Sequence, residues 1–111
     1  MQPKQIAKLI KQLCEEKKGI DPVILDVRKI SDITQYYVIV SGSSSPHVSA
    51  LADNIARGTK KKKERPWHVE KDRDSRWIVI DHGDVITHVF HSETRQYYNL
   101  ERLWGDAPQV D

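Results

Sequence analysis

The chain has 111 residues, of which 38% are apolar and 31% are charged. This length fits one domain, residues 1–111, and leaves no room for a second independent core. The 18 Lys and Arg residues against 16 Asp and Glu residues give a formal charge of +2, too balanced for a protein that coats nucleic acid through a broad cationic surface. The apolar residues recur in periodic runs, which excludes a disordered chain of this charge content.

The cysteine content and the length of the apolar runs indicate the cellular compartment of the protein. The single Cys14 cannot form an internal disulfide, which is typical of a reducing environment. Because Cys14 borders a helical core stripe, we expect a small buried residue there and not a reactive thiolate. The apolar runs are far shorter than the ~20 residues needed to cross a bilayer, and the first residues lack an unbroken apolar segment. We therefore expect a cytoplasmic protein without membrane contact.

The first half of the chain predicts a helix, two strands and a second helix. The helices have apolar side chains at helical spacing, and the strands are rich in β-branched and aromatic residues. In chain order these elements are Pro3 to Lys18, Val23 to Ile30, Tyr36 to Val40, and a helix that begins near Ser45 and frays in residues 59–65. The second strand is apolar throughout, as expected for a central strand covered on both faces. Ser45 can cap the second helix, with Pro46 in its first turn.

The second half predicts three strands and a short helix. Residues 66–70 can form an edge strand, and a loop follows. Two alternating apolar segments then flank His82-Gly83, which is typical of a hairpin with a two-residue turn. This turn predicts that Asp81 pairs with Asp84, Val79 with Ile86, and Trp77 with His88. Ser92 can cap the last helix, whose apolar positions include Tyr97, Leu100, Leu103 and Trp104.

Strand alternation divides the hairpin into two faces. A half-polar face carries Trp77, Val79, Asp81, Asp84, Ile86, His88 and Phe90. The drier face carries Ile78, Ile80, Val85, Thr87 and Val89. With the order of elements, this pattern predicts an α/β protein with one mixed sheet of about five strands and helices packed on it.

The serine-rich segment 41–45 is the first candidate for enzyme chemistry. It follows a strand and precedes a helix, where backbone N–H groups can bind phosphate. A Walker loop needs a different glycine spacing and a Lys-Ser/Thr pair, and a nucleotidyl transferase needs paired carboxylates shortly downstream. The next carboxylate is Asp53, inside the predicted helix. Helix capping is the favoured interpretation, and a nucleotidyl or phosphoryl transferase is kept as the alternative.

The acidic and histidine residues around the hairpin are the second candidate. Asp81, His82, Asp84, His88 and His91 are close in sequence, and imidazole and carboxylate groups bind zinc or iron. The predicted hairpin separates them, because His82 lies in the turn and His91 points away from His88. Asp81 opposite Asp84 could raise the pKa of one carboxyl group, although turn capping is the simpler role. We expect no metal, no cofactor and no catalytic residue.

After enzyme chemistry and metal binding, the remaining classes of function are binding to RNA and binding to protein. Lys60 to Lys63 with Arg65 give five positive charges in six residues, and Trp67 and His68 follow. Such a short run attracts phosphate without sequence specificity and is more often a solvated helix end, so general RNA binding is a second alternative. Aromatic side chains on a half-polar sheet face are frequent anchors of protein interfaces, although tryptophan is as often a core residue. One aromatic patch could combine Trp77, Tyr98 and Trp104.

Three segments carry a family resemblance, from about Val23 to Pro108. They are LDVRKISDITQYYVIVSGSSSPHVSALAD, RWIVIDHGDVITHVFH and TRQYYNLERLWGDAP, and they resemble the Iojap family of ribosomal silencing factors. The combination of D-x-G-D-V-x-x-H-V-F with Y-x-L-E-x-L-W is highly specific. The resemblance implies a nucleotidyltransferase-like fold that lacks the catalytic carboxylates.

The resemblance also implies a function and a contact surface. Such factors are non-enzymatic repressors that bind the large ribosomal subunit through its protein conventionally numbered fourteen. They block docking of the small subunit and lower translation under nutrient limitation. The implied contact residues are Trp77, Asp81, His82, Gly83, Asp84, His88, Tyr98, Leu103 and Trp104. Family members are also similar in being able to self-associate, which implies a possible homodimer.

The chain departs from its relatives between Lys60 and Ser75. Relatives commonly break the second helix with a glycine, whereas this chain continues with TKKKKERP. They also often carry a Glu-Gly pair and a short loop where this chain has EKDRDS. Neither difference touches the implied contact residues, but Lys60, Lys61, Lys62 and Lys63 can add a peripheral contact with ribosomal RNA.

Overall fold

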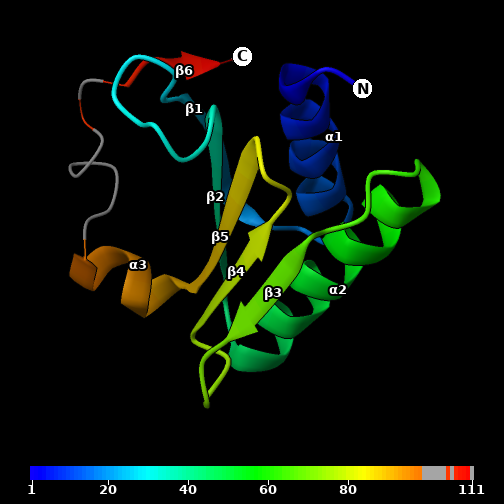
Figure 1. Cartoon of the computed structure of the whole chain (residues 1–111). Helices are drawn as coiled ribbons and strands as arrows, with labels where there is room; N and C mark the ends of the chain where they lie inside the picture. The colour runs from blue at the N-terminus through cyan, green and yellow to red at the C-terminus, as the bar shows by residue number, and fades with distance from the viewer. Residues whose placement is uncertain (99–104, 106, 111) are drawn as a thin grey trace.

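The computed structural model describes residues 1–98, 105 and 107–110, with residues 96–98 described by their backbone alone. The strands form one sheet in the order β3-β4-β5-β2-β1-β6, in which β2 and β5 are parallel and their neighbours antiparallel. The predicted mixed α/β sheet is therefore confirmed. In chain order the elements are α1 (Pro3–Glu16), β1 (Ile20–Asp26), β2 (Tyr36–Gly42), α2 (Ser45–Lys61), β3 (His68–Lys71), β4 (Trp77–Asp81), β5 (Val85–His91), α3 (Ser92–Tyr98) and β6 (Gln109–Val110) (Figure 1).

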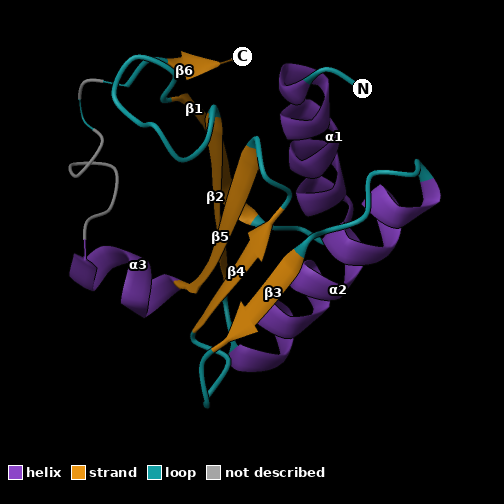
Figure 2. Ribbon diagram, in the orientation of Figure 1, coloured by secondary structure: helices purple, strands orange, loops and turns teal. Residues whose placement is uncertain are grey.

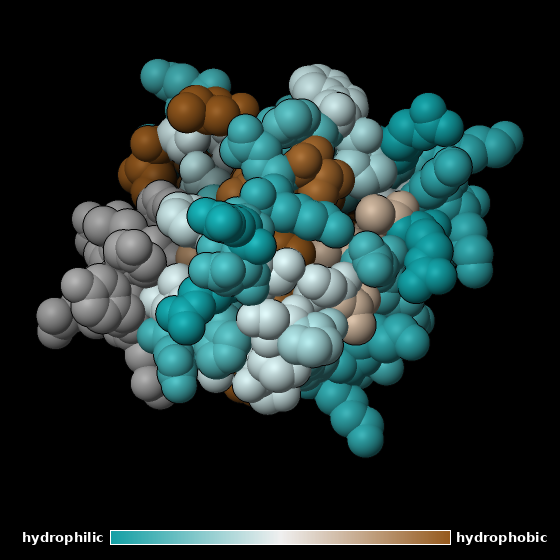
Figure 3. All heavy atoms as spheres, turned by 90° about the horizontal axis from the view of Figure 1, so that it is seen from below, coloured by the Kyte–Doolittle hydropathy of each residue, from teal (hydrophilic) through white to brown (hydrophobic). Residues whose placement is uncertain are grey.

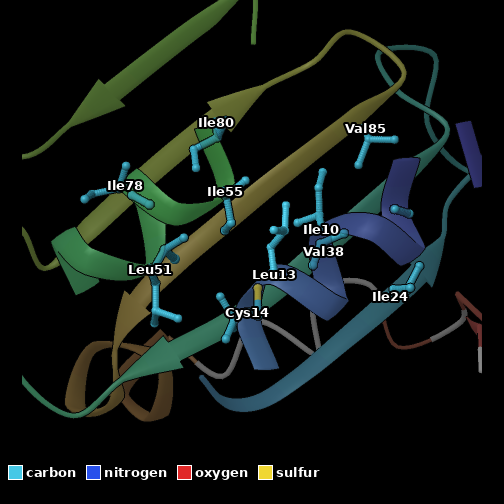
Figure 4. Close-up of a cluster of buried hydrophobic side chains, with 14 of the residues drawn as sticks. Ile10, Leu13, Cys14, Ile24, Val38, Leu51, Ile55, Ile78, Ile80 and Val85 are labelled. Atoms are coloured by element: carbon cyan, nitrogen blue, oxygen red, sulfur yellow. The ribbon is translucent and has the colours of Figure 1, made fainter. Parts of the chain in front are cut away.

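Helices α1 and α2 lie side by side on one face of the sheet (Figure 2). The main core fills the space between them and the strands, and its side chains point toward one another from both layers (Figure 4). The drier hairpin face, including Ile78 and Ile80, lies in this core and is fully buried. Burial of a large aliphatic side chain is worth about 1.5–3 kcal/mol, so this face of the sheet supplies much of the stability.

The opposite face of the sheet carries a second, smaller cluster. Four of its residues are buried, and Trp77 and Tyr37 pack against them half-buried. The buried members are Leu25, Val27, Ile39 and Phe90. The half-polar face predicted by alternation is therefore confirmed as the face turned away from α1 and α2. No helix in the described part of the chain is long and apolar enough to span a bilayer.

The first strand differs from the prediction at both ends. It runs from Ile20 to Asp26, not from Val23 to Ile30. A bulge with Asp21 at a φ of 51° accommodates Pro22, which has no N–H for the ladder. After Asp26 the chain turns, and the carboxylate of Asp26 pairs with the guanidinium of Arg28 at 2.7 Å.

The hairpin register was predicted wrongly by two residues. Asp81 pairs with Ile86, Val79 with His88, and Trp77 with Phe90, so Asp84 is not paired. The connection has three residues, His82 to Asp84, and the N–H of His82 donates to the carbonyl of Val85 at 2.9 Å. A shift of two residues leaves every side chain on its predicted face, because strand side chains alternate with a period of two.

Three smaller expectations are corrected. The N-cap of α2 is Ser44, whose hydroxyl accepts from the N–H of His47, so Ser45 is the first helical residue. At α3 the Nδ1 of His91 accepts from the N–H of Glu93 at 3.2 Å, so this imidazole and not Ser92 supports the first turn. The sheet has a sixth strand, β6, which is too short to produce an alternating pattern in the sequence.

Candidate functional site

Four aromatic rings come together on the face of the sheet opposite α1 and α2. They belong to Tyr37 on β2, Trp77 on β4, and His88 and Phe90 on β5, and we call them the aromatic cluster. The ring centroids of Trp77 and Phe90 are 5.0 Å apart, and those of Tyr37 and His88 are 5.3 Å apart. His88 and Phe90 are stacked at 5.8 Å. These separations are typical of favourable ring pairs, so the cluster is a rigid platform.

The polar atoms of the cluster are also fixed. The indole Nε1 of Trp77 donates to Nδ1 of His88 at 3.1 Å, which places the imidazole proton on Nε2. Burial lowers the pKa of His88 to about 4, because the charged imidazolium would lose its hydration. Burial likewise raises the pKa of Tyr37. The cluster is therefore an uncharged surface at neutral pH.

A hollow of about 340 Å³ lies beside the cluster. Trp77 and Val79 give it apolar walls, and Glu70, Lys71 and Asp72 surround them. The Oδ1 of Asp72 accepts from the N–H of Arg76 at 2.6 Å and from that of Trp77 at 3.1 Å, which holds the loop before β4. The hollow has the size and lining to take a side chain of a protein partner.

The turn between β4 and β5, residues 82–84, is held by contacts on both sides. The Oδ1 of Asp81 accepts from the N–H of Gly83 at 2.7 Å. The carbonyl of Asp84 accepts from the N–H groups of Gln35 and Tyr36, which ties the turn to the loop before β2. The turn therefore presents a fixed backbone with Asp84 exposed.

His82 points away from the aromatic cluster. It is only 8% exposed, and its Nε2 lies 3.1 Å from the hydroxyl of Thr59 on α2. Burial lowers its pKa. His82 is thus on the helix side of the sheet, whereas His88 is on the other side, and the structure does not bring these imidazoles together. Among the described residues, no group of three His, Cys, Asp or Glu side chains could hold a metal ion.

The serine-rich segment is occupied by internal contacts. The N–H of Ser43 donates to Nδ1 of His47 at 2.9 Å, and Nε2 of His47 donates to the carbonyl of Lys17 at 2.8 Å. A Cβ at Gly42 would lie 2.8 Å from the backbone nitrogen of Val48, so β2 and α2 meet in close contact there. These contacts build a helix start and use groups that a phosphate would need.

Sequence reasoning did not include Trp67 among the contact residues. Its side chain is 78% exposed, and it packs over the turn, because a Cβ at Gly83 would lie 2.7–2.9 Å from three atoms of the indole. Gly83 has a φ of +87°, which also favours glycine. The signal in the sequence is an aromatic residue that stands between a basic run and an edge strand.

The C-terminal contact residues are only partly placed. Tyr98 is the last residue of α3, and its side chain is not described. Leu103 and Trp104 lie outside the described residues. The predicted patch of Trp77 with Tyr98 and Trp104 therefore stays a prediction. Figure 3 views the end of the molecule that carries the β3–β4 loop, where hydrophilic and weakly polar residues cover most of the described surface.

The fold and the site define a small α/β protein that carries a rigid aromatic cluster on one face of its sheet. A family model described as "Ribosomal silencing factor during starvation" matches residues 1–111. The chain belongs to this family, RsfS, whose members silence ribosomes and are not enzymes.

Relatives of the chain cover nearly its whole length. A ribosomal silencing factor of Bacillus subtilis is 39% identical over 100% of this chain and 94% of its own, and one of Halalkalibacterium halodurans is 36% identical over 100% and 95%. The crystal structure of a Chromobacterium violaceum protein is similar with a TM-score of 0.91 and 32% identity, covering 95% of this chain and 88% of that one.

Proposed function

We propose that this silencing factor binds the large ribosomal subunit through the aromatic face and thereby blocks docking of the small subunit. The observation that carries the proposal is the fixed indole of Trp77, half-buried beside a hollow on a sheet face that α1 and α2 leave open. A mouse relative, 32% identical over 100 residues, is named for the mitochondrial assembly of the ribosomal large subunit, which supports the large subunit as the partner.

Inhibition by this route needs occupancy and bulk but no bond chemistry. The factor has to cover a surface that the small subunit also uses. An interface of standard size buries about 800 Å² on each partner, and a few anchors carry most of its free energy. The rigid cluster loses little side-chain entropy on binding, because its rings are already fixed.

The proposed partner on the subunit is the protein conventionally numbered fourteen. Trp77 and His88 supply the aromatic anchor, and Asp81, Gly83 and Asp84 supply the backbone and carboxylates of the turn. His82 contributes by holding that turn against α2. Tyr98, Leu103 and Trp104 complete the surface in this proposal. Residues 1–111 act as one silencing-factor domain in the cytoplasm, and a homodimer would compete for the same face.

The test is sedimentation with separated subunits. Purified protein is mixed with large subunits, small subunits or both, at a magnesium concentration at which the two subunits join without the protein, and each mixture is resolved on a sucrose gradient. We expect the protein to travel with the large subunit and joined particles to disappear as the protein is added. Travel with the small subunit, or undiminished joining at saturating protein, contradicts the proposal.

The matched variants are Trp77→Ala and Trp67→Ala, because each removes one indole. Trp77 is half-buried at the start of β4, and Trp67 is exposed beside the opposite end of that strand. Circular dichroism and urea unfolding verify that each variant is folded. Loss of an interface anchor costs about 2 kcal/mol or more, which is roughly a thirtyfold loss of affinity. We expect this loss for Trp77→Ala. Unchanged sedimentation of folded Trp77→Ala protein would remove Trp77 from the interface.

A further inference from the structure

We infer that Trp67 and the basic run Lys60–Lys63 with Arg65 form a second contact surface, one that binds an unpaired segment of RNA with a base stacked on the indole. The inference rests on the proposed function, because it supplies a ribosomal RNA contact beside the contact made by the aromatic face. It assigns a role to the segment between α2 and β3, which the aromatic face does not use.

Trp67 is exposed but not loose. Its N–H donates to the carbonyl of Asp81 at 2.8 Å, and its indole lies over Gly83, where even a methyl group would collide with the ring. One side of the ring system is thus supported by backbone while 78% of the side chain faces solvent. A supported, exposed ring is the arrangement on which unpaired bases stack, and such stacking is tolerant of base identity.

The neighbouring cations are available for phosphate. All five side chains, Lys60, Lys61, Lys62, Lys63 and Arg65, are exposed, and none forms an ion pair with a described carboxylate. The acidic residue inside the run, Glu64, is itself neutralised, because its Oε1 lies 2.9 Å from the terminal ammonium of Met1. Cations that keep their charge attract phosphates and release counterions when they bind.

The basic run and the indole are attached to the same turn. The hydroxyl of Thr59 contacts Nε2 of His82 at 3.1 Å, and the carbonyl of Thr59 accepts from the N–H of Glu64 at 2.9 Å. The end of α2 and Trp67 are thereby both fixed to residues 81–83. Figure 1 shows the short connection from α2 to β3 that carries this segment. A nucleic acid strand can then meet the cations and the ring without a folding step.

The composition around Trp67 favours RNA over a protein. Lysine is depleted in the cores of protein interfaces, whereas four consecutive lysines end only four residues before this indole. The next residues on β3 are exposed along the whole strand, and His68 contacts Glu70 at 3.4 Å. A base stack with flanking phosphates uses both the ring and the cations, whereas a protein anchor uses only the ring.

The first experiment measures RNA binding directly. A ten-nucleotide oligouridylate with a fluorescent end label is titrated with the full chain, and the anisotropy of the label is followed at 50 and 200 mM salt. We expect binding by the parent with quenching of its tryptophan fluorescence, an affinity at least about tenfold lower for Trp67→Ala, and partial rescue by Trp67→Phe, which keeps a stacking ring. An affinity that is the same in Trp67→Ala as in the parent overturns the inference.

The charge is tested with a matched pair of variants. Lys60, Lys61, Lys62 and Lys63 are changed to Gln in one protein, and Lys4, Lys8, Lys17 and Lys18, also exposed, are changed to Gln in the other. Both lose four charges, so a nonspecific effect of net charge is equal in both. We expect a weaker salt dependence only in the first protein. Equal losses in the two proteins contradict a defined surface.

Large subunits separate this inference from the proposed function. If the inference is wrong and the proposed function is right, Trp67→Ala binds large subunits as the parent does at both salt concentrations. If the proposed function is wrong, the parent itself does not travel with large subunits, whatever its affinity for the oligonucleotide. A Trp67→Ala protein that binds RNA normally but loses affinity for isolated large-subunit proteins identifies a protein contact and overturns the inference.

Discussion

The indole of Trp77 and the imidazole of His88 are joined diagonally across two strands. Trp77 lies opposite Phe90 and His88 lies opposite Val79, yet Nε1 of Trp77 reaches Nδ1 of His88 at 3.1 Å. Diagonal neighbours on one face of an antiparallel pair are close enough for aromatic side chains to interact. This bond fixes both the direction of the indole and the tautomer of the imidazole.

Trp77→Phe tests that bond separately from the ring. Phenylalanine keeps an aromatic side chain over Phe90 but removes the donor to His88, so a buried acceptor loses this partner. We expect the free energy of unfolding to fall by about 1–2 kcal/mol in urea titrations. Binding to the large subunit should fall less than in Trp77→Ala, because the ring remains. Parental stability of the phenylalanine variant would show that the hydrogen bond contributes nothing.

The stability of the protein should depend on pH through His88. Burial lowers the pKa of His88 from 6.5 to about 4, so the unfolded chain takes up a proton at a higher pH than the folded chain. The contribution of the neutral imidazole is fully present above pH 6.5 and is lost progressively as the pH falls toward 4. We expect a loss of about 3 kcal/mol over this window from His88, measured by urea unfolding at pH 7, 5.5 and 4.5.

The control for this prediction is His88→Asn, which does not titrate and keeps an acceptor near the position of Nδ1. Its unfolding free energy should decrease less between pH 7 and 4.5 than that of the parent. A remaining slope is expected from His82, whose pKa is also lowered by burial. Identical slopes in parent and variant would mean that folding does not lower the pKa of His88.

The periodicity of the sequence was sufficient to predict which face of the sheet each side chain lies on, but it was insufficient to predict the register of the strands. Alternation placed Trp77 and His88 on one face and Ile78 on the other, and a two-residue error in the hairpin did not change this result. The register depends on the number of residues in the turn. The hydrogen bond from His82 to Val85 and the contacts of Asp84 with the loop before β2 determine that number. The contacts of Asp84 join segments far apart in the sequence, so they leave no local pattern.

The placement of the candidate residues was predictable where one strand pattern or the family motif determined it. The common face of Trp77 and His88 follows from alternation, and the motif located the turn without its correct length. The support of Trp67 by Gly83 and the contact of His82 with Thr59 were not predictable, because each joins residues far apart in the sequence. Whether a histidine in a turn faces solvent or a helix is decided by that distant partner and not by its neighbours.

Gly58→Ala should destabilise the packing of α1 on α2. A Cβ at Gly58 would overlap the side chain of Leu13, which is buried between the two helices. Alanine improves helix propensity by about 1 kcal/mol, but overpacking costs about 1–3 kcal/mol, so we expect a net loss of up to about 2 kcal/mol. Urea unfolding measures it.

A double-mutant cycle with Leu13→Val tests the cause. Shortening Leu13 alone leaves a small cavity and is destabilising, whereas in the Gly58→Ala background it also removes the overlap. The second substitution should therefore cost less in the variant than in the parent. Strict additivity of the two changes would mean that Leu13 and residue 58 do not compete for the same space.

Cys14 should be inert in the folded protein. Burial, with a further effect of the negative charge of Glu15, raises the pKa of its thiol from 9.0 to about 12, and its side chain is fully buried. At pH 8 the thiolate population is then roughly a thousandfold below that of a free cysteine, and reagents cannot reach the sulfur. We expect a disulfide reagent to label Cys14 only as fast as the chain unfolds, so labelling should accelerate in urea in parallel with the loss of circular dichroism. Rapid labelling of the native protein, at a rate independent of urea below the unfolding transition, would mean that the packing between α1 and the sheet opens without global unfolding.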